Sequence, residues 1–203
     1  MNSAPYNIVF ELPPRARNNS IKLSKQLQKK GGIFALAETS FVPHITIYLT
    51  DFPKKNEKKI IEKLRKIAEE TNPIACKPLH YRKVSGGYVE ILYHKTKAMS
   101  DLQKVVISEI NPLRENILRE KYFTASAGLS TIKRKNLKRF GFTNIGMTYH
   151  PHVTLSRFTE GKEVLPKHML MSPLSFKVVS VGFYHRGEHG TCKKLVARFP
   201  LAG

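Results

Sequence analysis

The apolar and polar positions of this chain predict strands and helices in turn. Strands are predicted where β-branched and aromatic residues gather, at 6–12, 41–50, 74–82, 88–94, 151–158, 175–185 and 191–200. Ser85-Gly86-Gly87 separates the third and fourth of these runs, and Gly187-Glu188-His189-Gly190 separates the last two. We therefore expect two hairpins, one around each glycine-containing turn.

Helices are predicted where apolar residues recur at helical spacing. Such spacing covers 18–30, closed by Gly31-Gly32, and 54–71. A third helix is expected to start at a capping box, Ser100 to Gln103, and to kink or break at Pro112. The stretch 119–148 is basic and punctuated by glycines, and we expect it to be the least regular part of the chain.

The order of these elements repeats as helix, strand, helix and hairpin, which indicates an internal duplication. The first repeat covers about 1–94 and the second about 95–203, with 119–148 as a basic insertion. No linker rich in Gly, Ser or Pro separates the halves, so we expect one bilobal domain over 1–203. The predicted class is α/β of the α+β type, with pseudo-twofold duplicated antiparallel sheets flanked by helices and an active-site cleft between the lobes.

Charge is the unusual feature of an otherwise ordinary globular composition. Thirty-five Lys and Arg residues stand against 15 Asp and Glu, a formal net charge of +20. A polyanion such as nucleic acid is the expected partner, because each phosphate that the protein neutralises releases counterions. The alternative is that the charge serves solubility alone.

Several classes of protein are excluded by what the sequence lacks. No window holds 18 consecutive apolar residues, and the first residues lack the layout of a signal peptide, so we expect a cytoplasmic protein without a membrane partner. Cys76 and Cys192 lie far apart without a CxxC pair, which indicates neither a zinc site nor a disulfide framework. We expect a monomer that needs no cofactor and no metal.

The repeat is sharpest in two five-residue motifs. The first is Pro43-His-Ile-Thr-Ile47 and the second is Pro151-His-Val-Thr-Leu155. On a strand the side-chain period is two, so the histidine and threonine of each motif share one face and the two aliphatic residues point into the core. A pseudo-twofold arrangement would bring two imidazoles and two hydroxyls together in the cleft.

This set of groups suits a phosphodiester. One neutral imidazole takes a proton from the attacking water or hydroxyl, and one imidazolium gives a proton to the leaving oxygen. The hydroxyls donate hydrogen bonds to the non-bridging oxygens. A single His-X-Thr is more simply a hydrogen-bonded sheet histidine, but packing alone would not repeat the polar pair. We therefore predict His44 and His152 as catalytic and Thr46 and Thr154 as phosphate-binding.

The sequence resembles the two-histidine (2H) phosphoesterase superfamily, and within it the bacterial 2′-5′ RNA ligase and RNA cyclic phosphodiesterase branch. The resemblance rests on both motifs, on the run Tyr149-His-Pro-His-Val-Thr-Leu-Ser-Arg157 and on the Gly187 to Gly190 turn before Phe199-Pro-Leu201. It covers nearly the whole chain in order, although 119–148 matches no motif of the family. It implies a bilobal fold, no metal, and the same two histidines and two threonines in the site.

The resemblance implies action on RNA or nucleotides that carry a 2′,3′-cyclic phosphate or a 2′-5′ linkage. We expect hydrolysis of the cyclic phosphate to a 2′-phosphate, reversible ATP-independent 2′-5′ ligation, or both. The alternatives are a phosphodiesterase of 2′-5′ oligoadenylates or small cyclic nucleotides and a non-catalytic RNA-binding module.

Two residues near the motifs are further candidates for substrate contact. Strict alternation places Arg157 opposite His152, so it reaches a phosphate only if the strand bulges or ends nearby. Tyr48 has the parity to face the cleft and stack on a base, although a strand tyrosine is more often a packed aromatic.

The basic stretch before the second motif interleaves cations with aromatics. Cations that follow phosphates and aromatics that stack on bases are typical of a strand-binding surface. The candidate residues are Lys133, Arg134, Lys138, Arg139, Phe140 and Phe142. A solvated loop is the alternative.

His185, Glu188 and His189 match the HxxEH pattern of zinc peptidases. Gly187 and Gly190 instead predict a hairpin turn there, on which the two histidines would not project side by side. His150 and His152 also have metal-like spacing, but no third ligand is evident. We predict no metal site at either place.

Overall fold

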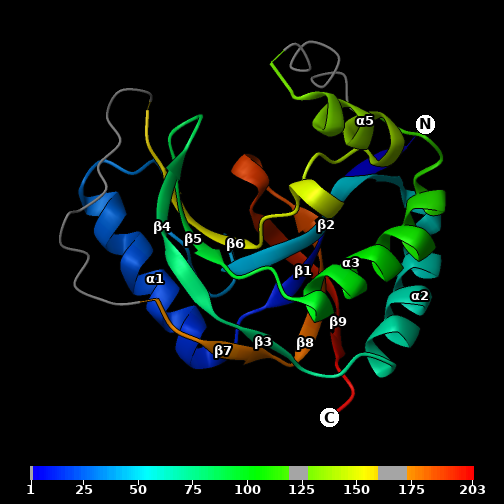
Figure 1. The fold of residues 1–203 in the computed structure, drawn as a ribbon, viewed down its shortest axis with the longest axis horizontal. Coiled ribbons are helices and arrows are strands. Elements are labelled where there is room, and N and C mark those ends of the chain that lie inside the picture. The colour runs from blue at the N-terminus through cyan, green and yellow to red at the C-terminus, as the bar shows by residue number, and fades with distance from the viewer. Residues whose placement is uncertain (1, 119–127, 160–172) are drawn as a thin grey trace.

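The computed structural model describes residues 2–118, 128–159 and 173–203. Within these residues the strands are β1 (Ser3–Glu11), β2 (His44–Pro53), β3 (Ile74–Cys76), β4 (Pro78–Val84), β5 (Tyr88–Tyr93), β6 (His152–Arg157), β7 (Phe176–Val178), β8 (Ser180–Arg186) and β9 (Cys192–Pro200). The helices are α1 (Pro14–Lys29), α2 (Glu57–Glu69), α3 (Lys97–Ile110) and α5 (Thr131–Phe140). Helices flank antiparallel sheets (Figure 1), so the predicted α+β class is confirmed.

The sheets combine strands from distant parts of the sequence. One sheet has the order β2-β1-β8-β9, a second has the order β4-β5-β6, and β3 pairs with β7. The strand of the first motif, β2, thus shares a sheet with the C-terminal hairpin, while the strand of the second motif, β6, pairs with the hairpin β4–β5. Each of the two larger sheets therefore contains strands from both halves of the chain.

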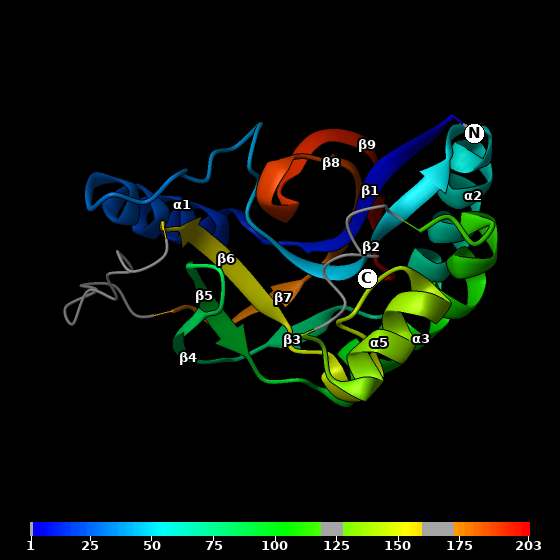
Figure 2. The same ribbon diagram turned by 90° about the horizontal axis from the view of Figure 1, so that it is seen from above.

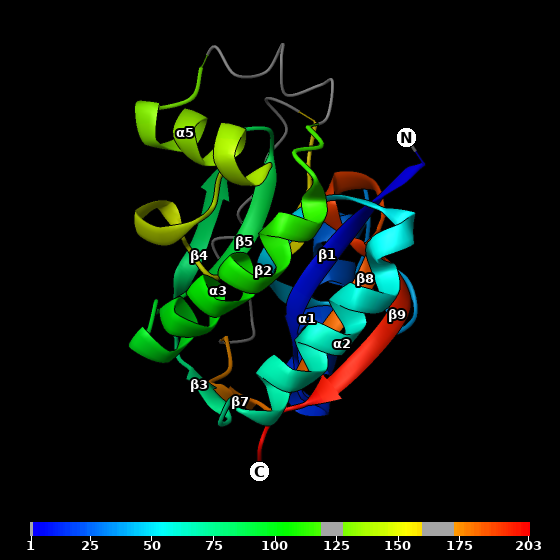
Figure 3. The same cartoon turned by 90° about the vertical axis from the view of Figure 1, so that its right-hand side faces the viewer.

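The helices cover these sheets on their outer sides. α1 packs against β6, whereas α2 packs against β8, β9 and α3, and α3 also contacts β2. Figure 2 shows α1 at one end of the molecule with α2, α3 and α5 at the other, and Figure 3 shows α2 lying across β8 and β9. The aliphatic residues of both motifs, Ile45, Ile47, Val153 and Leu155, are fully buried. The aliphatic residues of each motif strand thus pack into the core, and the histidines lie on the opposite face.

The predicted capping box is wrong. α3 begins at Lys97 and its cap is Thr96, four residues before the expected cap, because the Met99 backbone N–H donates to the Thr96 hydroxyl over 3.2 Å. Gln103 is instead buried, and its Nε2 donates to the backbone oxygen of Ile47 on β2. The predicted break is confirmed, since a 3₁₀ turn over Asn111–Arg114 that contains Pro112 ends the helix.

Two predicted strands are each divided by one residue. Lys77 separates β3 from β4, and Val179 separates β7 from β8. The short strands β3 and β7 pair with each other rather than extending the hairpins. The pattern of β-branched residues runs across both divisions, so it could not mark them.

The expectation for 119–148 is corrected by α5. Ser130 accepts a hydrogen bond from the Lys133 backbone N–H at the start of this helix, and Gly141 ends it with a φ of +67°. These are ordinary helix start and stop signals. Positions 119–127 of the stretch lie outside the described residues.

Across the part of the chain that the structure describes, no helix combines the length and the apolar character needed to span a bilayer.

Candidate active site

The two motif histidines occupy equivalent positions, each as the first residue of a strand and directly after a proline. The Nδ1 of His44 lies 2.7 Å from the backbone oxygen of Val42. The Nδ1 of His152 lies 2.7 Å from the backbone oxygen of His150. A carbonyl oxygen only accepts hydrogen bonds, so each Nδ1 carries a proton and each Nε2 is left to exchange one.

One pocket brings the four predicted residues together. His44, Thr46, His152 and Thr154 all line a cavity of about 510 Å³, and their strands, β2 and β6, contact each other. Each of the four side chains is half-buried, with the motif's aliphatic neighbours buried behind it. The predicted pairing of two imidazoles and two hydroxyls in one cleft is therefore present in the structure.

Both motif strands contain a β-bulge at the same place. In the pairing of β1 with β2, Val9 lies opposite Thr46 and Ile8 opposite Tyr48, so Ile47 is the extra residue. The register of β5 against β6 shifts in the same way around Leu155. A bulge reverses the alternation of the residues that follow it. The side chains after each bulge therefore change faces.

The change of face after each bulge determines whether Arg157 and Tyr48 line a cavity. Arg157 lines the cavity next to the histidines, which strict alternation would not have allowed. Tyr48 is turned into the core with no exposed surface, where its one O–H is shared between two acceptors, the backbone oxygen of Phe140 at 2.6 Å and Asn111 Oδ1 at 2.9 Å. The suggestion that Tyr48 contacts substrate is wrong, and Leu49 lines the pocket in its place.

His44 is held neutral by its surroundings. Burial lowers the pKa of His44 to about 4, opposed by the hydrogen bond to Val42 and assisted by the charge of His152. The Nδ2 of the buried Asn7 lies 3.1 Å from His44 Nε2 and donates to it, which requires that nitrogen to be unprotonated. Asn7 Oδ1 has no partner within the described residues. The same Nδ2 also donates to the backbone oxygen of Gly190 over 3.3 Å, so the amide is held in the orientation that suits a neutral His44 ring.

His152 lies beside a carboxylate instead. Glu90 Oε1 is 3.4 Å from His152 Nε2, and the other oxygen of Glu90 accepts from Arg82 Nε over 2.9 Å. Glu90 is 5% exposed, so little water screens its charge from the ring. Glu90 thus places a carboxylate beside His152, where His44 has the amide of Asn7.

The basic segment contributes to the pocket through some of its members only. Lys133 and Phe142 line the cavity that holds the histidines. Arg134 and Lys138 are exposed on α5, and the guanidinium of Arg139 lies 5.1 Å from the centre of the Phe140 ring. Phe140 is half-buried and packs against the core. The structure thus places Lys133 and Phe142 in the site and the other candidates outside the residues that line it.

The sequence argument missed residues around the pocket that belong to no motif. Glu90 of β5 lines the pocket, as do Arg82 and Thr143, whereas Asn7 of β1 contacts His44 without lining it. His150, which the sequence argument considered only as a metal ligand, also lines the pocket. Burial and then the charges of Arg82, Lys95 and Lys133 lower the pKa of His150. Arg82 and Lys133 both line the pocket, against Glu90 as the one carboxylate among the described lining residues, and this excess of cations suits an anionic substrate.

The HxxEH sequence lies on a hairpin, as predicted. His185 belongs to β8, while Glu188 and His189 form the 3₁₀ turn Glu188–Gly190 that precedes β9. Within 2–118, 128–159 and 173–203, the structure contains no group of three or more His, Cys, Asp or Glu residues placed to hold a metal ion.

The fold is that of the two-histidine phosphoesterases, as the resemblance in sequence predicted. Escherichia coli LigT complexed with phosphate matches with a TM-score of 0.61 at 13% identity, over 100% of both chains. LigT complexed with 3′-AMP matches with a TM-score of 0.61 at 15% identity, again over 100% of both. TT0787 of Thermus thermophilus matches with a TM-score of 0.63 at 12% identity, over 98% of each chain. At these identities the likeness concerns the fold.

Residues 51–174 match the family described as protein of unknown function (DUF1045), and the chain belongs to this family. The matched region contains the second motif and begins after the first. No curated protein sequence matches the chain.

Proposed function

We propose that this protein is a metal-independent phosphoesterase of RNA ends. It hydrolyses a 2′,3′-cyclic phosphate to a 2′-phosphate, performs reversible ATP-independent 2′-5′ ligation, or both, and acts as a cytoplasmic monomer. The observation that carries the proposal is the single pocket lined by His44, Thr46, His152 and Thr154. The net charge of +20 supports a nucleic-acid substrate. LigT, which shares the fold, has been crystallised with phosphate and with 3′-AMP.

The different surroundings of the two histidines support different roles in hydrolysis. His44, neutral at pH 7, takes a proton from water as the water oxygen attacks phosphorus. The bond from phosphorus to O3′ breaks, and O3′ takes a proton from the His152 imidazolium beside Glu90. The phosphate stays on O2′, which gives the 2′-phosphate product.

The threonines act on the oxygens that are not transferred. The Thr46 and Thr154 hydroxyls donate to the non-bridging oxygens as negative charge grows on them. Ligation uses the same geometry, with a 5′-hydroxyl in place of water. The reverse reaction exchanges the roles of the two histidines, so the same pocket serves both directions.

The test is incubation of the purified protein in EDTA with a short RNA that ends in a 2′,3′-cyclic phosphate. The expected result is ring opening with the phosphate on the 2′ position, assigned by ³¹P NMR. A product with a 3′-phosphate would contradict the proposed cleavage of the bond to O3′. No ring opening, together with turnover of 2′-5′ oligoadenylates or small cyclic nucleotides, would move the protein to that class of phosphodiesterase. RNA binding without any turnover would make it a binding module.

A further inference from the structure

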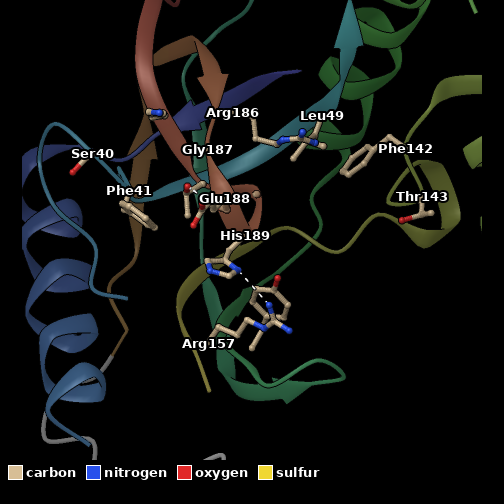
Figure 4. A pocket seen from close by; sticks show the side chains of 14 residues that line it. Ser40, Phe41, Leu49, Phe142, Thr143, Arg157, Arg186, Gly187, Glu188 and His189 are labelled. Atoms are coloured by element: carbon tan, nitrogen blue, oxygen red, sulfur yellow. Dashed lines mark hydrogen bonds between the residues drawn. The ribbon is translucent and has the colours of Figure 1, made fainter. Parts of the chain in front are cut away.

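A second cavity, of about 1200 Å³, adjoins the pocket of the two histidines. The two cavities share part of their walls, namely Leu49, Phe142, Thr143 and the turn residues His189, Gly190 and Thr191. Figure 4 shows the β8–β9 turn and Arg157 reaching toward each other across this space. The smaller pocket has the volume of a site for one small ligand, which leaves the larger cavity for a further part of the substrate.

Arg157 is fixed in this cavity by contacts that leave donors for a ligand. Its Nε donates to the backbone oxygen of Gly86 over 2.8 Å, and its guanidinium lies 5.2 Å from the centre of the Tyr88 ring. Its Nη1 lies 3.3 Å from His189 Nδ1 and must donate, because a guanidinium has no acceptor. The two hydrogen bonds use two of its five N–H groups. Arg157 is therefore held in place while Nη2 stays available to an anion.

His189 is fixed by its backbone conformation and by a ring contact. Its φ is +56°, a left-handed conformation that is rare for a residue other than glycine. Its ring stacks on Phe34, with centroids 5.5 Å apart and planes 14° apart. Since Nδ1 accepts from Arg157, the neutral ring carries its proton on Nε2 and offers a second donor. Strained residues of this kind concentrate at binding and catalytic sites.

The rest of the wall has the character of a nucleotide site. Arg186 pairs with Asp51 over 3.8 Å, so its charge is partly satisfied, whereas Arg157 has no acidic partner among the described residues. Tyr88 lies beside this cation, and Phe142 lines another part of the same cavity. Cations beside exposed aromatics bind a phosphate and the base that accompanies it.

We propose that this cavity binds the nucleotide that precedes the reacting end of an RNA, with Arg157 and His189 on the phosphodiester that joins the last two nucleotides. The proposal rests on the proposed function, because a terminal cyclic phosphate has a neighbour on its 5′ side only. Tyr88 and Phe142 offer stacking faces to the base of that neighbour. The protein therefore acts on an oligonucleotide end in preference to a free cyclic nucleotide.

The test compares kcat/KM for adenosine 2′,3′-cyclic phosphate with that for a triadenylate ending in the same group. Wild type is expected to prefer the trinucleotide by about tenfold or more, the value of one or two hydrogen bonds to a charged group. His189→Gly suits the left-handed backbone and removes the imidazole, so it tests the contact without a risk to folding. In this variant and in Arg157→Ala the preference is expected to fall toward one, mainly through a higher KM. Lys194→Ala, which removes an exposed charge outside the cavity, is the matched control.

Equal kcat/KM values for the two substrates, or a preference that His189→Gly and Arg157→Ala leave intact, would overturn the subsite. Turnover of neither substrate by wild type would instead show that the proposed function fails. The subsite is then tested by calorimetry with triadenylate and 2′-AMP as ligands. Tighter binding of the trinucleotide that His189→Gly abolishes supports the subsite, and equal binding of the two ligands overturns it.

Discussion

The two half-sites share a backbone and differ in what surrounds it. Each has a histidine after a proline, an Nδ1 bound 2.7 Å from a carbonyl oxygen two residues earlier, and a bulge three residues after the histidine. The first then places an amide, Asn7, on its histidine, and the second places a carboxylate, Glu90. Beyond the bulges, Leu49 lines the pocket on one side and Arg157 on the other.

The difference shows that a duplicated frame need not give equivalent groups. The amide of Asn7 donates to His44 Nε2 and so suits the neutral imidazole, whereas the carboxylate of Glu90 can only accept from a ring nitrogen that carries a proton. His44 thus suits the role of a base and His152 that of an acid, although their strands are alike. The positions after the two bulges differ as well, since one carries the apolar Leu49 and the other the cationic Arg157.

The largest effect on turnover is expected when either histidine is removed. His44→Ala and His152→Ala are each expected to lower kcat by about 10²- to 10⁴-fold on an RNA with a cyclic phosphate end, as for a lost general acid or base. Single-turnover kinetics with saturating enzyme measures the effect. Because the two act in one step, the double variant should lose less than the product of the single losses. A variant that keeps wild-type turnover would remove that histidine from the mechanism.

Replacement of either threonine is expected to have the next largest effect on kcat/KM. Thr46→Val and Thr154→Val each remove one hydrogen bond to a charged oxygen and should lower kcat/KM by about 10- to 100-fold. Thr46→Ser and Thr154→Ser keep the hydroxyl and are the matched controls. Full activity in the valine variants would show that the hydroxyls do not contact the phosphate.

Asn7 and Glu90 should affect the acid limb of the pH profile differently. With the pKa of His44 at about 4, its neutral form persists on acidification, so kcat/KM should stay level as the pH falls and decline only near pH 4. Asn7→Asp adds a carboxylate that stabilises the His44 imidazolium, so the acid limb should move to higher pH. Glu90→Gln leaves the direct contacts of His44 intact, so the acid limb should stay where it is in wild type. Profiles of both variants, with the exposed Glu69→Gln as control, would contradict this difference if the acid limb moved in each.

The smallest effect is expected for Tyr48→Phe. The variant loses the hydrogen bonds to Asn111 and to the Phe140 backbone oxygen, which should lower the free energy of unfolding by about 1–2 kcal/mol. For a protein of this size that is a fall in Tm of a few degrees, measurable by circular dichroism. Turnover should be unchanged because the side chain is buried. A lower activity at unchanged stability would restore a role for Tyr48 in the site.

Much of the frame could be predicted from local pattern. Alternation in β2 and β6 correctly separated Ile45 and Val153, which are buried, from His44 and His152, which face the pocket. The glycine turn between β8 and β9 was likewise visible in the sequence. These features depend on neighbouring residues alone, which is why a pattern predicts them.

The rest depended on partners far away in the chain. Tyr48 is buried because of a bulge in the pairing of β2 with β1. The contact of Asn7 with His44 likewise joins β1 to β2. The Arg157–His189 contact joins β6 to the turn before β9. These contacts have no local signature. The capping box is a different kind of error, because Thr96, four residues before Ser100, is itself a local cap signal and already caps the helix.

The order of strands in the larger sheet also governs how the protein is made. β1 pairs with β8, Tyr6 opposite His185 and Phe10 opposite Val181. This pairing can form only after β8, which lies near the C-terminus, has been synthesised. Such distant pairing slows folding, and the nascent chain meanwhile exposes the unpaired edge of β1. A product cut short before β8 would thus be a chain prone to aggregation and in need of a chaperone, and not a half-enzyme with one working motif.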